Sequence, residues 1–198
     1  MAKILIAVPH GGMIEVDTFA SVYNMRRPDG HEVVFKSFYG YNIDHVRNAI
    51  SDHAIKEGFD MVLFVDSDMT LPRETLERMV SANVDIVSGV YVKKNDEKTI
   101  PVAMIKELGK EPRYLTPSEI SGNGMMEVDA VGFGCVLVKT EVLKRIGYPQ
   151  FQYRQALEVK NTTGEDIDFC LKAKYRNFRI YLMTDLLLGH IGRKKYTI

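Results

Sequence analysis

Two carboxylates follow directly on a run of five apolar residues. In the segment MVLFVDSDMTLP (61–72), the apolar residues 61–65 end at Asp66 and Asp68, which are separated by one serine. Residues two apart in an extended chain project to the same side, roughly 6.6 Å apart along the strand, so a loop could bring both acids onto one cation. Oxygen ligands suit Mg²⁺ or Mn²⁺, and such an ion would remove the repulsion between two close carboxylates. The segment therefore predicts a metal site, with a solvated loop in which Asp68 caps the next helix as the alternative.

A second acidic cluster lies in TTGEDIDFC (162–170). Thr163 or Gly164 can cap a helix whose first turn holds Glu165 and Asp166, where the helix dipole favours anions. These acids could serve only to stabilise the helix. Alternatively, an ionised carboxylate at this position could accept a proton from a hydroxyl nucleophile.

A histidine and several basic residues stand near the carboxyl terminus. His190, in the segment LLLGHIG, is expected on a tight loop, where it could be structural or could complete the coordination begun by Asp66 and Asp68. Arg193, Lys194 and Lys195 follow it. Such residues usually form a solvated face, but they would lie beside a bound phosphate if His190 contacts the metal.

The composition is that of an ordinary globular protein. The chain has 198 residues, 45% of them hydrophobic and 26% charged, which predicts a single domain with a sizeable core. Lys plus Arg and Asp plus Glu are both 26, so no overall field would attract a polyanion. Cys135 and Cys170 lie in apolar segments and are predicted to be reduced core residues. We see no signal peptide and no membrane-spanning run, and we expect a cytoplasmic protein.

The elements that would position these groups alternate along residues 1–92. Strands are predicted at 3–9, 31–38, 61–65 and 84–92, with Pro9 ending the first, and a helix is expected between each pair. The second helix would use Ile43, Val46, Ile50 and Ala54 as its inner face, with Arg47 and Asn48 on its polar side, and the third would hold Pro72 in its first turn. This pattern predicts a parallel sheet between two helical layers, and ligands of such sheets bind at the carboxyl ends of the strands.

The pattern changes after residue 92. Residues 93–124 are polar, interrupted by proline and glycine, and contain short strand-like runs. Residues 125–139 read as two β runs hinged at Gly132 and Gly134. A helix from Thr140 ends at Gly147, and after a polar loop a helix over 165–177 leads to a last strand over 178–185.

Six segments in this order resemble a known enzyme family. ILIAVPHGG, VRNAI, FVDSDMTLP, VGFGCVLVK, GEDIDFCLKA and GHIG match the GT-A nucleotide-sugar glycosyltransferases, near the family 2 type and its small phage-encoded members. The resemblance implies an α/β, GT-A type three-layer sandwich with a mainly parallel, Rossmann-like central sheet and a small β-rich insertion. It implies one domain over 1–198, with a nucleotide-binding half (1–92) and an acceptor and catalytic half (93–198).

The resemblance also implies roles for individual residues. Asp68 and His190 would ligate the metal, and Asp66 would join them or lie beside the ribose. Asp166, with Glu165 beside it, would be the general base. The remaining donor-binding residues would be Pro9, Arg47 and Asn48 at the nucleoside, Gly132, Phe133 and Gly134 at the sugar and acceptor, and Lys194 at the phosphates. Lys172 and Lys174 stand where the family often has an arginine, which leaves phosphate contacts from this helix open.

The implied activity is metal-dependent transfer of a hexosyl or pentosyl group from a nucleoside-diphosphate sugar to an acceptor hydroxyl, with inversion. Mn²⁺ or Mg²⁺ would be the cofactor and a UDP-sugar the favoured donor. The acceptor could be a glycan, a protein, a small molecule or a hydroxymethylated DNA base. Two alternatives stay open: a haloacid-dehalogenase-like phosphatase with Asp66 as nucleophile and Asp68 as acid/base, and a non-catalytic nucleotide-sugar binding module.

Overall fold

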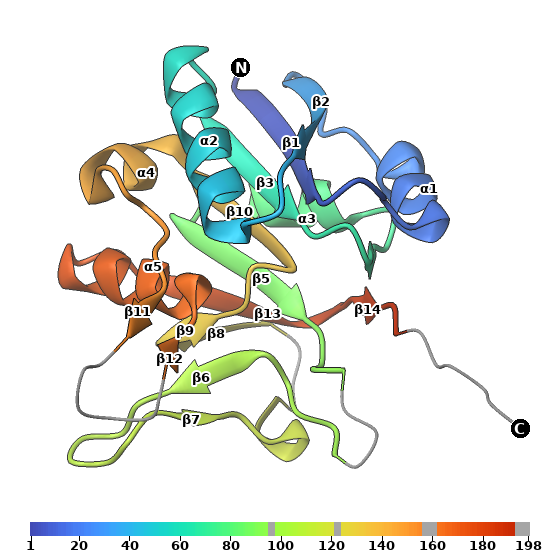
Figure 1. Cartoon of the computed structure of the whole chain (residues 1–198). Helices are drawn as coiled ribbons and strands as arrows, with labels where there is room; N and C mark the ends of the chain where they lie inside the picture. The colour runs from blue at the N-terminus through green and yellow to red at the C-terminus, as the bar shows by residue number, and fades with distance from the viewer. Residues whose placement is uncertain (95–97, 121–123, 156–161, 193–198) are drawn as a thin grey trace, which may run out of the picture.

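A seven-stranded sheet runs through the centre of the molecule in the computed structural model (Figure 1), in the order β2-β1-β3-β10-β5-β13-β8. The structure describes residues 1–94, 98–120, 124–155 and 162–192. The strands of this sheet are β1 (Lys3–His10), β2 (Glu32–Tyr39), β3 (Met61–Val65), β5 (Ile86–Val90), β8 (Met125–Val128), β10 (Cys135–Lys139) and β13 (Ile180–Leu187). Only β8 and β10 run antiparallel to their neighbours, so the predicted mainly parallel sheet is confirmed.

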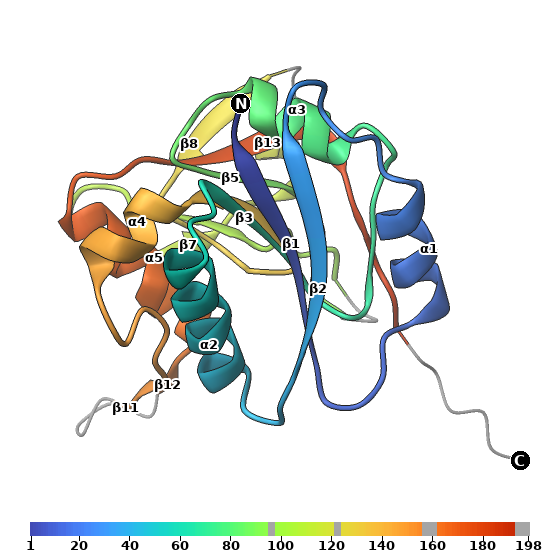
Figure 2. The same cartoon turned by 90° about the horizontal axis from the view of Figure 1, so that it is seen from above.

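Helices cover both faces of this sheet, which confirms the three-layer architecture (Figure 2). The helices α2 (Ile43–Lys56), α4 (Thr140–Ile146) and α5 (Glu165–Tyr175) share one buried apolar cluster with the sheet. The helices α1 (Val16–Asn24) and α3 (Thr75–Ser81) share the other. In the part of the chain that the structure describes, no helix is both long and apolar enough to cross a bilayer.

The predicted β-rich insertion is a separate small sheet, drawn below the main one in Figure 1. It has the order β7-β6-β9, from β6 (Ala103–Ile105), β7 (Arg113–Tyr114) and β9 (Ala130–Val131), with a 3₁₀ turn η1 (Pro117–Ile120) after β7. Two further pairs of two-residue strands are present: β4 (Met69–Thr70) with β14 (Gly189–His190), and β11 (Arg154–Gln155) with β12 (Thr162–Thr163).

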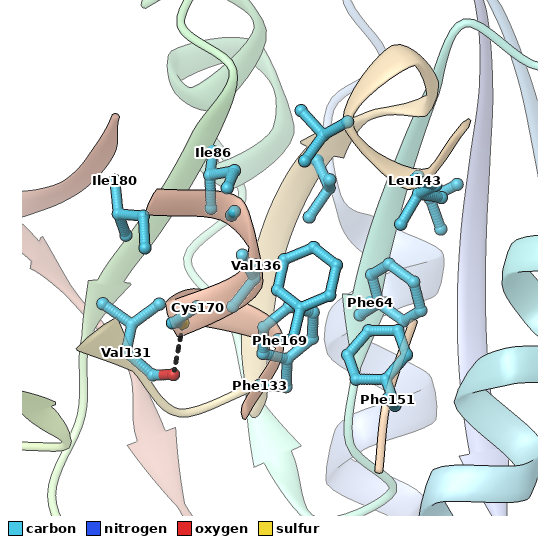
Figure 3. Packing of buried hydrophobic residues seen from close by; sticks show 14 of the residues in the cluster. Phe64, Ile86, Val131, Phe133, Val136, Leu143, Phe151, Phe169, Cys170 and Ile180 are labelled. Atoms are coloured by element: carbon cyan, nitrogen blue, oxygen red, sulfur yellow. Dashed lines mark hydrogen bonds between the residues drawn. The ribbon is translucent and has the colours of Figure 1, made fainter. Parts of the chain in front are cut away.

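Four aromatic side chains pack together between the amino-terminal half of α5 and the sheet (Figure 3). Phe151 stacks on Phe169 at 4.7 Å, and Phe133 meets both at 4.9 Å with edge-to-face geometry. Phe64 of β3 packs against Phe133 and Phe151 at 5.4 and 5.6 Å. All four are buried, and such pairs add stability beyond their buried area. The cluster therefore holds the amino end of α5 at the carboxyl end of β3.

Several local predictions are confirmed. The helix α4 ends at Gly147, whose φ of 76° is the left-handed conformation that glycine adopts without strain. Gly164 caps α5, whose first turn holds Glu165 and Asp166. Cys135 and Cys170 are buried and free.

Other local predictions are wrong. Pro9 does not end the first strand, because β1 continues to His10 and pairs with β2 along its whole length. The Gly40 N–H donates to the His10 carbonyl, so the backbone groups of His10 face β2 and those of Pro9 face the other side, toward β3. The pairing of β1 with β3 has already ended at Ala7, so no hydrogen bond is lost because Pro9 has no N–H. In the third helix, Pro72 precedes the first turn, since residues 69–70 form β4 and α3 begins at Thr75.

Arg47 and Asn48 do not lie on a polar, solvated side of α2. Both are buried, at 3% and 6% exposure, because α4, α5 and the segment around Phe151 pack over this part of the helix. In α1, Val22 is buried, whereas Phe19 and Tyr23 are exposed.

Candidate active site

The two acids of the DSD segment lie in a turn at the end of β3. The backbone N–H of Asp66 donates to the Gly134 carbonyl at 2.9 Å, which continues the pairing of β3 with β10 by one bond. The Met69 N–H then donates to the Asp66 carbonyl at 3.3 Å and closes the turn. The side chains of Asp66 and Asp68 are 32% and 31% exposed, so both carboxylates are accessible from solvent.

The pairing of β4 with β14 brings His190 to this turn. Gly189 pairs with Thr70 and His190 with Met69, and the Ile191 N–H donates to the Asp68 carbonyl at 2.8 Å. His190 is thus held in a short antiparallel ladder and not on the predicted tight loop. As a result, Nε2 of His190 lies 3.7 Å from Oδ1 of Asp68.

The other ring nitrogen of His190 is fixed by the backbone. Nδ1 lies 2.9 Å from the Val92 carbonyl oxygen, and the ring meets Tyr91 edge-on at 5.6 Å. A carbonyl can only accept a hydrogen bond, so Nδ1 carries a proton and donates it. The hydrogen bond with Asp68 raises the pKa of His190, and a protonated Nε2 can donate toward Oδ1 of Asp68. In the neutral imidazole the Nε2 lone pair would face Asp68 instead, which is the arrangement that a metal ligand requires.

Asp68 also contacts a lysine. Oδ2 lies 2.5 Å from Nζ of Lys94, which follows the end of β5. A hydrogen bond donated by the protonated His190 ring lowers the pKa of Asp68 to about 2, and the Lys94 ammonium adds to this effect against the opposing influence of burial. Asp68 is therefore an ionised carboxylate between two groups that favour negative charge.

These residues fit a cation that a ligand helps to coordinate. Among the residues that the structure describes, no three Asp, Glu, His or Cys side chains are arranged to hold a metal ion by themselves. Asp68 offers an oxygen and His190 a nitrogen, whereas Oδ1 of Asp66 already accepts a hydrogen bond from Arg47 at 2.7 Å. Mg²⁺ commonly uses one or two protein ligands together with substrate phosphates and waters, so the donor set suits an ion of this kind.

Arg47 connects the DSD turn to α5. Its guanidinium donates to Asp66 and to Glu165 of α5, and it lies over the Phe133 ring at 5.4 Å. Glu165 is itself only 6% exposed. Burial raises the pKa of Asp66, and the charge of Arg47 opposes that rise. A single buried cation thus neutralises two carboxylates from elements far apart in the chain.

Asp166 differs from Glu165 in forming no ion pair with any residue that the structure describes. Its Oδ1 accepts the Ile167 N–H at 2.7 Å, and its side chain is partly exposed. Burial raises the pKa of Asp166, and the neighbouring Glu165 charge raises it further. A partly buried carboxylate with a raised pKa at a helix amino end is a suitable proton acceptor. Of the two acids predicted to be catalytic, Glu165 therefore holds Arg47, whereas Asp166 stays partly exposed.

A cleft of about 230 Å³ opens beside the DSD turn. The carboxyl ends of β1 and β2, the start of α2 and the turn itself line it, with the residues Pro9, His10, Gly11, Gly40, Tyr41, Ile43, Asp66, Ser67 and Asp68. Of the lining residues, His10 and Tyr41 both contact the ring of Tyr39, with centroids 5.8 and 5.5 Å apart. Of the residues predicted to contact the nucleoside, Pro9 therefore lines this cleft.

Other predicted donor-binding residues are placed elsewhere. The side-chain amide of Asn48 donates to the Phe151 carbonyl at 2.8 Å and accepts the Phe151 N–H at 3.0 Å, so it holds a loop and does not line the cleft. Phe133 is 1% exposed within the aromatic cluster. Lys194 lies outside the described residues.

Gly132 and Gly134 serve the packing of Tyr91. A Cβ on Gly132 would lie 2.3 Å from the Tyr91 hydroxyl, and one on Gly134 would lie 2.8 Å from its ring. The Gly134 N–H also donates to this hydroxyl at 3.0 Å. Because the Tyr91 ring also packs against His190, the two glycines help to position the His190 ring through Tyr91.

The two lysines of α5 are not available for phosphate. Lys172 pairs with buried Asp168 at 2.6 Å and donates to the Pro149 carbonyl, and Lys174 pairs with Asp129. Sequence reasoning instead missed Tyr41 and Tyr91 and assigned no role of its own to Lys94. Their positions at or just after the ends of β2 and β5 were the available signal, since ligands bind at that edge of the sheet.

The sequence matches no protein-family model and no curated protein. Several solved structures nevertheless resemble the chain. A197 from STIV aligns with a TM-score of 0.65 and 22% identity over 96% of this chain and 86% of that one. GalNAc-T7, solved with UDP, GalNAc and Mn²⁺, aligns with a TM-score of 0.64 and 12% identity over 98% of this chain and 44% of that one. TarS of S. aureus aligns with a TM-score of 0.55 and 18% identity over 96% and 37%.

At these identities the likeness concerns the fold. GalNAc-T7 and TarS are glycosyltransferases, and this chain spans less than half the length of either. The predicted GT-A-like fold is thereby confirmed over almost the whole chain.

Proposed function

We propose that this protein transfers a sugar from a nucleoside-diphosphate sugar to an acceptor hydroxyl, with the help of a divalent cation. The observation that carries the proposal is the approach of His190 to Asp68 at the edge of a cleft that Pro9 and Asp66 border. The GT-A-like fold places this approach at the carboxyl edge of the sheet, where ligands of open α/β sheets bind.

The cleft would bind the nucleoside and direct its diphosphate toward Asp68 and His190. Tyr41 and His10 offer ring faces and edges to a base, and Asp66 offers a carboxylate oxygen to a ribose hydroxyl while Arg47 holds it in place. Asp68 and His190 are the residues that would hold Mn²⁺ or Mg²⁺. A bound divalent cation would supply charge stabilisation to the departing diphosphate.

Asp166 is the group we assign to the acceptor. Its carboxylate would accept the proton of the attacking hydroxyl, and attack from the face opposite the leaving group predicts inversion at the anomeric carbon. Glu165 and Arg47 keep the start of α5 aligned with the DSD turn, so that this base and the donor site stay in one geometry.

A UDP-sugar and Mn²⁺ are the donor and ion that we favour, because the fold neighbour GalNAc-T7 was solved with UDP, GalNAc and Mn²⁺. The hexosyl or pentosyl class, the acceptor and the cytoplasmic location stay predictions. A phosphatase with Asp66 as nucleophile is less suited to this site. Both the GT-A-like fold and the ion pair of Asp66 with the buried Arg47, which reduces the nucleophilicity of that carboxylate, count against it.

The test is a thermal-shift screen of nucleotide sugars, with and without Mn²⁺ and with EDTA, on the full chain and two variants. We expect stabilisation by one donor that chelation removes, and loss of that stabilisation in Asp68→Asn. Asp166→Asn should still bind the donor, but its turnover in a sugar-transfer assay should fall by a factor of roughly 10² or more.

Each alternative gives a different result. Release of inorganic phosphate from a phosphomonoester, without donor binding, would support the phosphatase. Donor binding with no sugar transfer by the wild type, and no effect of Asp166→Asn in any assay, would support a non-catalytic binding module.

A further inference from the structure

The strand β2 forms an open edge of the central sheet. Among the described residues it pairs with β1 alone, over eight consecutive positions. The Glu32 N–H donates to the carbonyl of Ala2, just before β1, and the Gly40 N–H donates to the carbonyl of His10 at the end of β1. Because the direction of backbone groups alternates along a strand, the N–H and C=O groups of residues 33, 35, 37 and 39 point away from the sheet. Such an edge is a template for another strand.

An apolar stripe of α1 lies beside this edge. Val16, Phe19 and Tyr23 are 80%, 51% and 73% exposed, and their spacing places them on one side of the helix. Phe19 stacks on Tyr23 at 6.2 Å and meets Phe35 of β2 edge-on at 6.3 Å. Figure 2 shows α1 and β2 together along one side of the molecule. The edge and the stripe thus form one continuous surface with large apolar side chains, which we call the β2–α1 surface.

The charges of β2 select a partner and a register. Glu32 and Lys36 are exposed, and within the described residues neither pairs with an opposite charge; Lys36 Nζ lies 3.3 Å from the His53 ring. They lie on the same face of the strand, four residues apart. If a second β2 ran antiparallel with Val34 opposite Val34, each Glu32 would face the Lys36 of the other strand. Centring the pairing on Lys36 would instead set two ammonium groups opposite each other, which is unfavourable.

This register also satisfies the backbone and the apolar residues. In this register Val33 of each strand lies opposite Phe35 of the other. Both residues have N–H and C=O groups that point outward, so each of these two pairs can exchange hydrogen bonds. A two-fold axis perpendicular to the sheet keeps the same face of both sheets on the same side. The two α1 stripes would then flank the axis on one face, and the two Glu32–Lys36 pairs would lie on the other.

We propose that the β2–α1 surface binds a second copy of this chain through antiparallel pairing of β2 with β2, centred on Val34, to form a two-fold symmetric dimer with one continuous sheet. The proposal is independent of the sugar-transfer function, since it uses none of the residues assigned to that site.

Sedimentation velocity of the full chain over a range of concentrations tests the proposal. We expect a concentration-dependent dimer. Lys36→Glu should raise its dissociation constant by at least about tenfold, because two attractive pairs become repulsive. The exchanged variant Glu32→Lys/Lys36→Glu should dimerise again. Lys144→Glu, the same change at an exposed residue of α4, serves as the matched control and should dimerise as the wild type does.

A second variant tests the apolar part of the surface. Tyr23→Ser should weaken the dimer while circular dichroism and thermal unfolding show a folded chain. A wild type that stays monomeric at all concentrations would overturn the proposal and leave the surface to a different partner. A dimer that Lys36→Glu does not weaken, or that the exchanged variant does not restore, would place the interface elsewhere.

Discussion

Nε2 of His190 lies 3.7 Å from Oδ1 of Asp68, although the two residues are far apart in the sequence, one in the turn after β3 and the other in β14. The two-residue ladder of β4 with β14 and the Val92 carbonyl together fix this approach. The relationship is specific enough to test one contact at a time.

The first prediction concerns the imidazole itself. His190→Ala should weaken Mn²⁺ binding in the presence of the nucleotide by at least about tenfold, since even residues that only orient a metal ligand contribute tenfold or more. Isothermal titration with Mn²⁺ and UDP measures it. His45→Ala, at an exposed position of α2, is the control. Equal Mn²⁺ affinity in the wild type and His190→Ala would remove His190 from the proposed site.

The second prediction concerns the ladder that carries His190. A Cβ on Gly189 would lie 2.1 Å from Oγ1 of Thr70 and 3.5 Å from its Cβ. Gly189→Ala should therefore lower the free energy of unfolding by about 1–3 kcal/mol and weaken Mn²⁺ binding. Thr70→Ala/Gly189→Ala, compared with Thr70→Ala alone, should recover most of both losses. Urea unfolding and the same titration show whether it does; no recovery would mean that the clash is not the cause.

The third prediction concerns the buried cation. Arg47→Met should destabilise the fold by about 3–5 kcal/mol, because Asp66 and Glu165 would lose their common partner. Arg47→Lys should destabilise the fold less than Arg47→Met does, because it keeps the positive charge. It should still be less stable than the wild type, since an ammonium lacks the planar fork that reaches two carboxylates. Urea unfolding gives the free energies. Adding Asp66→Asn and Glu165→Gln to Arg47→Met should restore much of the stability, and a further loss would contradict this account.

The fourth prediction concerns pH. Burial and Glu165 raise the pKa of Asp166. A base acts only when ionised, so activity should be lost as the pH falls through this raised value. The acid limb of kcat/KM should thus lie above the range of an ordinary aspartate. Glu165→Gln removes the negative neighbour and should move the limb to lower pH. A pH–rate profile of donor consumption measures both, and an unmoved limb would argue against Asp166 as the base.

The fifth prediction concerns Lys94, whose ammonium must leave Asp68 before a metal ion can bind there. In the absence of nucleotide, Lys94→Ala should increase Mn²⁺ affinity by up to about fivefold, because partly exposed ion pairs contribute about 0.2–1 kcal/mol. Lys110→Ala, which removes a comparable pair with Glu107 in the insertion, should leave it unchanged. Weaker binding in Lys94→Ala would show that the lysine assists the ion and does not compete with it.

Local patterns in the sequence determined the elements and the polar groups at their ends. The apolar run 61–65 specifies a buried strand wherever it is placed, and the acids after it must then stand at the sheet edge. Gly147 and Gly164 mark helix ends because their roles depend only on neighbouring backbone. The order of these segments was enough to predict the GT-A-like fold.

Only the tertiary structure decided which polar residues are buried and which distant residues meet. The position of Arg47 on α2 looks solvent-facing from helical spacing alone, but Glu165 and Phe133 arrive there from other elements and enclose it. The pairing of β4 with β14 involves two residues on each side, too few to leave a periodic signal, and yet it sets the distance between Asp68 and His190. Spacing along a chain encodes contacts within one element, whereas contacts between elements depend on how all of them pack at once.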